Sequence, residues 1–399
     1  MKLKTISQVK KLKNKTVLVR VDYNVAIKHG KLLETERIER SLTTINYLLK
    51  KKARVILMSH LGSPSGKVVK DLSLKPIAIY LDSQLKNRVY FIDNCTGAQV
   101  RQKVAQLKPG QILLLENLRF NPGEEKNDAK FAQELASLAD LYVNEAFSVC
   151  HRAHASVSSI TKYLPAYAGF NLTNEVENLS KLLKGFKRPA IAIIGGVKIS
   201  TKIKVIENLL KRYDNVLLGG ALANNFFVAQ KLNVGKSIVE KDYFKLAKEL
   251  LKKARGKLIL PIDVRLARKL KPNSKIEIVR VSALNKVKNK KFQIVDIGPK
   301  TENYYEGFIN KSQTIVWNGP VGVMEIEPFA HGSEFICQKV AAHAKGSAFG
   351  IIGGGETIAV LEKLKLKNWP DFVSTAGGAM LEFLEGKVLP GIRPLLKQK

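Results

Sequence analysis

The sequence predicts an α/β protein of two units, each a parallel β-sheet covered by helices. Three observations predict this fold. Short β-branched runs alternate with longer amphipathic segments along the whole chain. Glycines and polar residues follow these runs, at the strand ends where open α/β sheets bind ligands. A polar helical stretch at 174–184, followed by Pro189, separates two such series, and 399 residues suffice for two cores.

Each half supplies its own strands and helices. In the first half we expect strands at 17–21, 55–59, 89–92, 112–115 and 141–143. In the second half we expect them at 190–194, 216–218, 258–260, 294–295, 314–317 and 348–352. Apolar residues at helical spacing predict intervening helices at 41–50, 131–139, 202–210, 243–252 and 335–344.

The composition is that of an ordinary soluble protein. No apolar stretch approaches the roughly 20 residues that span a bilayer, and the N-terminus lacks the apolar core of a signal peptide, so we expect a cytoplasmic location. Cys95, Cys150 and Cys337 are odd in number and widely spaced. They therefore favour neither a disulfide framework nor a zinc site.

The net charge of +33 is the compositional outlier. It is compatible with a nucleic-acid footprint, with a field that steers an anionic substrate, or with a lysine-rich solvated surface. The lysine clusters at 10–15 and 286–291 lack the interleaved aromatic residues of a base-stacking platform. This favours the solvated surface.

The segment 191–202 is the most informative one in the chain. An apolar run ends in Gly195 and Gly196 and passes into a helix start that carries Lys198 and Lys202, which we place on one helix face. Glycines and a helix N-terminus let a backbone approach a phosphate closely. The spacing is neither that of a P-loop nor that of a dinucleotide fingerprint. Alone, it is equally compatible with a tight strand-to-helix turn bearing solvated lysines.

The residues that follow the strands differ between the two halves. Basic residues with polar partners follow the strands of the first half: Asp22, Asn24, His60, Arg119 and the stretch 144–152. Glycines dominate in the second half: Gly195–Gly196, Gly219–Gly220, 318–320 and 353–357. This contrast indicates a small anionic substrate on one unit and a nucleotide on the other.

The ordered motifs resemble those of the phosphoglycerate kinase family over essentially the whole chain. They include V-L-V-R-V-D-Y-N-V at 17–25, S-H-L-G at 59–62, L-E-N-L-R-F at 115–120, H-R-A-H-A-S at 151–156, V-W-N-G-P at 316–320 and L-E-F-L-E-G-K at 381–387. The resemblance implies two Rossmann-like domains joined by a hinge helix, with a C-terminal segment that returns to the N-terminal domain. It also implies a glycolytic, ATP-binding transferase that works as a monomer.

The resemblance implies the domain boundaries and the substrate site. The N-terminal domain, 1–173 with about 386–399, would bind 3-phosphoglycerate, 174–188 would form the helix and hinge, and 189–385 would bind the nucleotide. The substrate residues would be Asp22, Asn24, Arg37, His60, Ser63, Arg119 and Arg152. Asp22 and Asn24 would bind the hydroxyl and carboxylate end. The arginines suit a phosphate because their planar fork of donors stays charged at physiological pH.

On the second domain the resemblance implies a site for ADP or ATP with Mg²⁺. Its residues would be Gly195, Gly196, Lys198, Lys202, Gly219, Gly220, Asn318, Glu327, Gly354, Gly355, Glu356 and Thr357. Glu327 would hold the ribose, and Glu356 would face the metal. Read by themselves, Glu327 is compatible with an ordinary exposed carboxylate and the glycines at 353–355 with a sharp turn.

The expected mechanism follows from the placement of charge. Phosphoryl transfer needs alignment of donor and acceptor oxygens and stabilisation of the charge on the transferring group. Arg37 and Lys198 are expected to supply this stabilisation, and neither acts as an acid or base. Because the substrates lie on separate domains, transfer is expected to require hinge closure, which also excludes water.

The chain departs from the family pattern at several positions. Ser63 stands where the family usually has arginine, so one phosphate-facing cation is missing. Glu356 replaces the aspartate on the metal side, Glu145 replaces the aspartate of N-D-A-F, and Ala376 replaces a glycine. We expect an active enzyme of reduced efficiency. The competing classes are a basic nucleic-acid-binding protein on a kinase scaffold and a nucleotide-binding regulator without catalysis.

Overall fold

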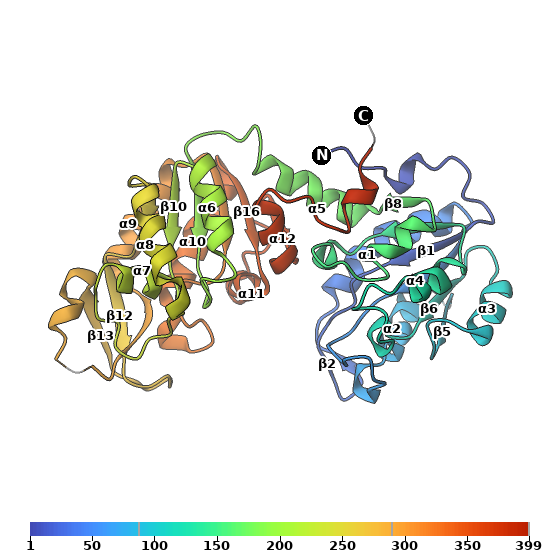
Figure 1. Ribbon diagram of the computed structural model, residues 1–399, viewed down its shortest axis with the longest axis horizontal. Helices are drawn as coiled ribbons and strands as arrows, with labels where there is room; N and C mark the ends of the chain where they lie inside the picture. Colours follow the sequence, from blue (N-terminus) through green and yellow to red (C-terminus); the bar gives the residue numbers. More distant parts are fainter. Residues whose placement is uncertain (87, 289, 398–399) are drawn as a thin grey trace. The chain divides into compact units, whose positions relative to one another are not determined.

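Two six-stranded sheets form the framework of the chain, one in each of two units (Figure 1). The first unit contains Met1–Glu177 and Val388–Lys399, and the second contains Asn178–Lys387. The computed structural model describes residues 1–86, 88–288 and 290–397, so the last two residues of the expected C-terminal segment lie outside the described residues.

The sheet of the first unit has the strand order β5-β6-β4-β1-β7-β8, and all neighbours are parallel. Its strands are β1 (Thr16–Arg20), β4 (Arg54–Met58), β5 (Val89–Ile92), β6 (Ile112–Leu115), β7 (Leu141–Asn144) and β8 (Ala166–Ala168). The helices are α1 (Glu36–Lys50), α2 (Lys75–Gln84), α3 (Ala98–Ala105) and α4 (Ala129–Ala136). A short hairpin, β2 (Ile27–Lys28) with β3 (Lys31–Leu32), follows β1.

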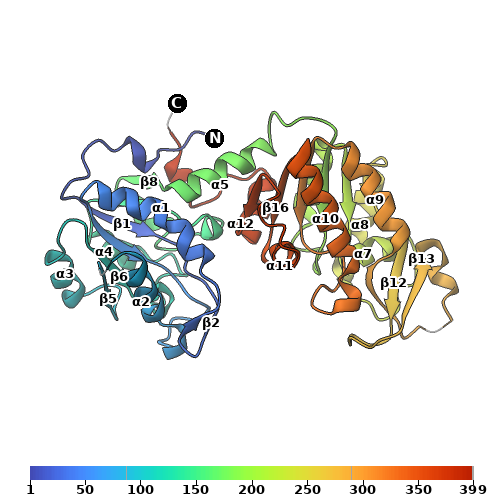
Figure 2. The same cartoon turned by 180° about the vertical axis from the view of Figure 1, so that it is seen from behind.

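Apolar side chains on both faces of the sheet hold this unit together. Every residue of β1 is buried, as expected for a parallel strand covered on both sides. Val17 and Val19 belong to the same apolar cluster as Ile45 and Leu48 of α1. Figure 1 shows α4 on one face of the sheet, and the reverse view in Figure 2 shows α1 on the other.

The second unit repeats the plan with the strand order β11-β10-β9-β15-β16-β17, again parallel throughout. Its strands are β9 (Ala190–Ile194), β10 (Asn215–Leu218), β11 (Leu258–Ile259), β15 (Thr314–Asn318), β16 (Phe349–Gly353) and β17 (Phe372–Ser374). The helices are α6 (Ile203–Arg212), α7 (Ala223–Ala229), α8 (Phe244–Lys253), α9 (Pro299–Lys311), α10 (His331–Gly346), α11 (Gly355–Lys363) and α12 (Gly377–Leu384). Helices α6 and α10 cover opposite faces (Figures 1 and 2).

A third, antiparallel sheet departs from the all-parallel expectation. Strands β12 (Asp263–Ala267), β13 (Ile276–Arg280) and β14 (Gln293–Ile297) pair in the order β13-β12-β14. The run at 294–295, expected as part of the parallel series, belongs to this sheet. The sequence did not separate the two because a short apolar run carries no information about its partner strand.

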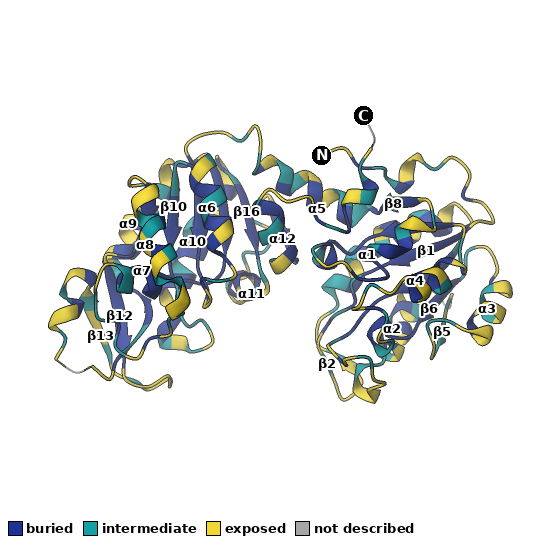
Figure 3. Ribbon diagram, in the orientation of Figure 1, coloured by how far each residue is buried: buried dark blue, intermediate teal, exposed yellow. Residues whose placement is uncertain are grey.

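Helix α5 (Phe170–Lys181) begins in the first unit and ends in the second. The C-terminal segment returns to the first unit, where the Lys4 backbone N–H donates to the carbonyl of Leu395 at 2.7 Å and the Gly391 N–H donates to the carbonyl of Cys150 at 2.9 Å. Figure 3 shows that strands inside the parallel sheets, such as β1 and β16, are largely buried, while helices such as α6 keep one exposed face.

Candidate active site

In the first unit, polar side chains gather where β1 and β4 end. The carboxylate of Asp22 accepts hydrogen bonds from Arg37 Nη1 at 2.8 Å and from Ser148 Oγ at 2.6 Å. Asn24 Oδ1 accepts one from the Gly62 backbone N–H at 2.9 Å. The loops after the two strands are thereby tied together.

Arg37 lies in the first turn of α1, which begins at Glu36 rather than at the expected residue 41. The added residues 36–40 are charged except for Ile38, which packs in the core, and this single apolar residue among charges did not extend the expected helix. The side chain of Arg37 is 26% exposed. It combines a fixed carboxylate partner with access to solvent, as a ligand-binding arginine requires.

His60 is buried and neutral. Burial lowers the pKa of its imidazole well below the usual value, and the charges of Arg20 and Arg119 add to this effect. Arg20 Nη2 lies 3.1 Å from His60 Nδ1. Because a guanidinium can only donate, Nδ1 accepts, and the ring carries its proton on Nε2. His60 therefore offers one N–H donor without a charge.

The side chain of Arg119 contacts the loop that contains Ser63. It is 5% exposed, its Nη1 donates to the Gly62 carbonyl at 2.7 Å, and Ser63 Oγ lies 3.4 Å from the same nitrogen.

Arg152 is exposed, and its Nε donates to His151 Nε2 at 3.3 Å. Burial lowers the pKa of both His60 and Arg119, and the charge of Arg152 lowers both pKa values further. The structure thus brings all seven expected substrate residues to one edge of the first sheet.

In the second unit, loops from three strands meet around Gly195 and Gly196. The Gly195 N–H donates to the Asn318 carbonyl at 3.0 Å, and the Gly196 N–H donates to the Pro320 carbonyl at 2.7 Å. Gly196 has φ +98°, and any Cβ on Gly195 would overlap the backbone at Pro320. Glycine is required at both positions by conformation and by close approach.

Lys198 and Lys202 differ in a way that the sequence did not predict. Helix α6 begins at Ile203, so the two lysines do not lie on one helix face as expected. Lys198 is exposed in the loop. Lys202 is 8% exposed, and its Nζ donates to the carbonyls of Gly195 at 2.6 Å and Asn318 at 3.2 Å. Burial lowers the pKa of Lys202 to about 8, although the carboxylate of Glu356 opposes this effect.

The loops that follow β10, β15 and β16 pack beside the Gly195–Gly196 loop. Gly220 has φ +67°, and its N–H donates to the Val321 carbonyl at 2.9 Å, while Gly219 approaches the Val321 side chain closely. Asn318 Nδ2 donates to the Gly353 carbonyl at 2.9 Å. These contacts bring the ends of β9, β10, β15 and β16 together.

The turn into α11 completes this group. Gly354 adopts φ +96° directly before the helix, and Thr357 Oγ1 accepts a hydrogen bond from the Gly319 N–H at 2.7 Å. Gly355 and Glu356 are exposed in the first helical turn. A helix N-terminus with an exposed carboxylate beside it suits a metal-bound phosphate.

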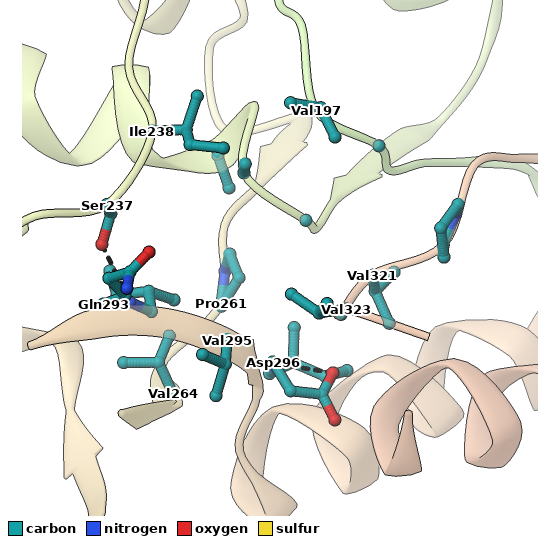
Figure 4. Close-up of a pocket in the computed structure, with 18 of the residues that line it drawn as sticks. Val197, Ser237, Ile238, Pro261, Val264, Gln293, Val295, Asp296, Val321 and Val323 are labelled. Carbon is teal, nitrogen blue, oxygen red and sulfur yellow. Dashed lines mark hydrogen bonds between the residues drawn. The ribbon is translucent and has the colours of Figure 1, made fainter. Parts of the chain in front are cut away.

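A cavity of about 190 Å³ opens beside the glycine loops (Figure 4). Its walls are mostly apolar and come from segments far apart in the sequence: Gly196, Val197, Gly220, Ala221, Ala223, Phe227, Ser237, Ile238, Pro261, Val264, Leu270, Gln293, Ile294, Val295, Asp296, Ile297, Pro320, Val321, Gly322, Val323, Glu325 and Glu356. Of these residues, the sequence predicted only Gly196, Gly220 and Glu356 as nucleotide-binding. The apolar walls carry no spacing signal, because each is a single side chain on a different element.

Glu325 lines this cavity and Glu327 does not. The carboxylate of Glu327 is 78% exposed and accepts a hydrogen bond from Lys363 Nζ at 2.9 Å. Of the two carboxylates in this loop, Glu325 is therefore the one that lines the cavity, and Glu327 is held at the surface by Lys363.

The described residues contain no preassembled metal centre, since no three of their histidine, cysteine, aspartate or glutamate side chains gather into a possible ligand set. Mg²⁺ often binds through one or two carboxylates together with substrate phosphates. The single exposed carboxylate of Glu356 fits that mode. Within the same part of the chain, no helix has the length and apolar character of a membrane span.

Known proteins of one family are similar to this chain over almost its whole length. The model of the family described as "Phosphoglycerate kinase" matches residues 6–387. A phosphoglycerate kinase from Moorella thermoacetica is 48% identical over 390 residues, covering 97% of this chain and 98% of that protein. One from Rhizobium meliloti is 43% identical over 403 residues, covering both chains completely.

Solved structures are also similar to this chain over nearly its whole length. The structure of a phosphoglycerate kinase from Coxiella burnetii has a TM-score of 0.86 and 41% identity, with 99% of each chain covered. That of an enzyme of the same name from Pyrococcus horikoshii OT3 has a TM-score of 0.85 and 32% identity, with 98% of each chain covered.

Proposed function

This chain belongs to the phosphoglycerate kinase family, and from this premise we propose that it transfers a phosphoryl group reversibly from 1,3-bisphosphoglycerate to MgADP, giving 3-phosphoglycerate and MgATP. The main support for this function is the match to the family model over residues 6–387. The curated relatives that match carry the kinase name and lend no support to a nucleic-acid-binding function. A cytoplasmic location and a monomeric state remain predictions.

The first unit is proposed to bind 3-phosphoglycerate at the edge where its polar side chains gather. Arg37, Arg119 and Arg152 supply guanidinium donors for the phosphate and the reacting carboxyl group, and Asp22 and Asn24 receive the hydroxyl and carboxylate end. Two observations support this placement. Asp22 holds Arg37 in position at 2.8 Å, and His60 presents an uncharged N–H donor among the cations.

The second unit is proposed to bind the nucleotide in the cavity beside the glycine loops. The apolar walls suit a flat base, and the carboxylate of Glu325 at the cavity suits the ribose hydroxyls. Lys198 and Lys202 then face the phosphates. Glu356 would hold Mg²⁺, which when bound neutralises phosphate charge and orients the transferring group.

Transfer is proposed to proceed in line. The bond from the acyl oxygen to phosphorus breaks as a bond forms between that phosphorus and an oxygen of the ADP β-phosphate. Arg37 and Lys198 stabilise the charge on the three transferring oxygens, and neither residue exchanges a proton. Direct transfer requires the attacking β-phosphate oxygen of ADP to come within about 3–3.5 Å of the phosphorus, in line with the bond that breaks. We therefore propose that the units close around the 174–188 connection and exclude water.

A coupled assay with ATP and 3-phosphoglycerate tests this function. Removal of one preorganised donor from a charge-stabilising site typically costs about 100- to 1000-fold in kcat, and we expect this loss for Arg37→Ala and for Lys198→Ala. Lys50→Ala and Lys204→Ala, at exposed positions of α1 and α6, are the matched controls and should retain activity. An inactive wild-type enzyme would contradict the proposal.

A further inference from the structure

Residues 237–240 lie between α7 and the short helix Lys241–Tyr243, and we call them the strap. They contact both the cavity and the loop at 197–202. Ser237 and Ile238 line the cavity (Figure 4). Glu240 contacts the loop that carries Lys198 and Lys202. The strap thus touches both the place proposed for the base and the loop proposed for the phosphates.

Glu240 contacts the loop through both oxygens of its carboxylate, which bind the same residue, Ser200; we call this pair of hydrogen bonds the clamp. Its Oε2 accepts a hydrogen bond from the Ser200 backbone N–H at 2.9 Å, and its Oε1 accepts one from Ser200 Oγ at 2.7 Å. Burial alone would raise the pKa of Glu240, but the hydrogen bonds from Ser200 and the Ile199 N–H, with the charge of Lys198, lower it below its usual value. Glu240 is therefore ionised at neutral pH, and its hydrogen bonds are charge-assisted.

Buried asparagines fix the strap itself. Asn225 Oδ1 accepts a hydrogen bond from the Glu240 N–H at 3.0 Å, and Asn224 Nδ2 donates to the Ile238 carbonyl at 3.1 Å. Both asparagines are almost completely buried in α7. On the other side, Ser237 Oγ accepts a hydrogen bond from the Ile294 N–H at 2.8 Å. The strap is held from both sides, so Glu240 is a fixed support.

The part of the loop that carries Lys198 makes little packing of its own, although the next residue, Ile199, is buried. Val197 is 47% exposed, and Lys198 is exposed. A segment with little buried apolar surface opens locally at low cost in free energy. The Glu240 carboxylate ties it down through Ser200, two positions from Lys198.

We propose that Glu240 is a positioning residue, which holds the 197–202 loop through Ser200 so that Lys198 and Lys202 meet the phosphates of a nucleotide. This inference rests on the proposed function, because it assumes that the phosphates of the nucleotide bind at this loop. Glu240 itself contacts neither substrate. Its effect should therefore depend on the phosphates and not on the base.

The test compares two ligands by titration calorimetry on the full chain, without turnover. A support of two charge-assisted hydrogen bonds predicts that Glu240→Gln raises the Kd of MgADP about tenfold. The Kd of adenosine, which lacks phosphates, should change less than twofold. Unchanged adenosine binding also shows that the variant is folded. Glu277→Gln, which removes the same charge from an exposed position of β13, is the control and should bind both ligands like the wild type.

Ser200→Ala provides the second variant, because it removes the hydroxyl half of the clamp. It should weaken MgADP binding in the same selective way, and adding it to Glu240→Gln should change the Kd less than twofold further, since both act through one contact. Equal weakening of MgADP and adenosine, no change, or tighter MgADP binding would each overturn the inference. Failure of the wild type to bind MgADP would overturn the inference and the proposed function together. A phosphate-selective loss without kinase activity would count against the proposed function alone.

Discussion

At the scale of residues, two glutamates two positions apart have different surroundings. Glu325 lines the cavity, whereas Glu327 pairs with Lys363 at the surface. An exposed ion pair contributes about 0–1 kcal/mol, so Glu327 has little influence beyond its own surroundings. A carboxylate that binds the ribose hydroxyls in a largely apolar cavity has a larger effect on nucleotide binding.

We expect Glu325→Gln to raise the KM for MgADP about tenfold, because it weakens charge-assisted hydrogen bonds to the ribose. Glu327→Gln should leave this KM within twofold of the wild-type value. The measurement is the nucleotide KM at saturating 1,3-bisphosphoglycerate. A larger effect of Glu327→Gln than of Glu325→Gln would restore Glu327 as the ribose residue.

We expect Lys202 to couple nucleotide binding to pH. Burial lowers its pKa to about 8, so the free protein begins to lose this charge in mildly alkaline solution. Nearby phosphates favour the charged amine and raise its pKa again. MgADP binding at pH 8 should therefore take up protons, and the affinity should fall above pH 8.

Calorimetry in two buffers with different ionisation enthalpies measures this proton uptake. Lys202→Met, which cannot titrate, should abolish the uptake and flatten the pH dependence. Identical apparent enthalpies in both buffers with the wild-type protein would show that Lys202 does not change protonation on binding.

At the scale of elements, Glu145 links strand β7 to the start of α5. It is 1% exposed, its Oε1 accepts hydrogen bonds from Thr44 Oγ1 at 2.5 Å and from the Asn171 N–H at 3.0 Å, and it fills the space above Gly169. Burial raises its pKa to about 7, although the hydrogen bonds oppose this shift. The carboxyl group thus stays protonated over a pH range in which the unfolded chain is ionised.

The sign of the pH effect follows from this shift. Between about pH 4.5 and pH 7 the folded state binds more protons at Glu145 than the unfolded state does, so stability falls as pH rises through this window. Glu145→Gln should remove this loss, on the order of 1–3 kcal/mol between pH 5 and pH 8. Urea unfolding at both pH values measures it.

Glu134→Gln, in α4, is the control for this experiment and should keep the wild-type pH dependence. The same loss of stability in Glu145→Gln as in the wild type would show that another group causes it.

At the scale of the whole molecule, the expected substrate and nucleotide residues belong to different units, and from this we expect a closing motion. The expected substrate residues all belong to the unit built on β1, and the expected nucleotide residues all belong to the unit built on β9. Since direct transfer needs contact between the bound partners, each substrate alone should favour closure less than both together.

Small-angle X-ray scattering tests this expectation. The radius of gyration should be smaller with 3-phosphoglycerate and MgATP together than with either ligand alone. An identical radius in all three states would contradict closure of the units on binding.

The sequence predicted much of the fold and part of the site, for identifiable reasons. Helix α6 was placed within a residue of its start, because Ile203, Ile206 and Leu210 repeat at helical spacing. From the sequence, Gly195, Gly196 and Gly220 are expected to allow close backbone approach, and the structure has a positive φ at Gly196 and Gly220 and a close backbone contact at Gly195. The cavity walls such as Phe227 and Ile238 were missed, because an isolated apolar residue looks the same in a core and in a pocket.

By itself the sequence determined the family, the two series of alternating strands and helices, and the positions of the glycine turns, because these depend on local spacing and residue type. Only the tertiary structure decided that Lys202 is buried while Lys198 is exposed, that Glu325 rather than Glu327 lines the cavity, and that β12–β14 form a separate sheet. These outcomes depend on contacts between segments far apart in the chain, and no local pattern records them.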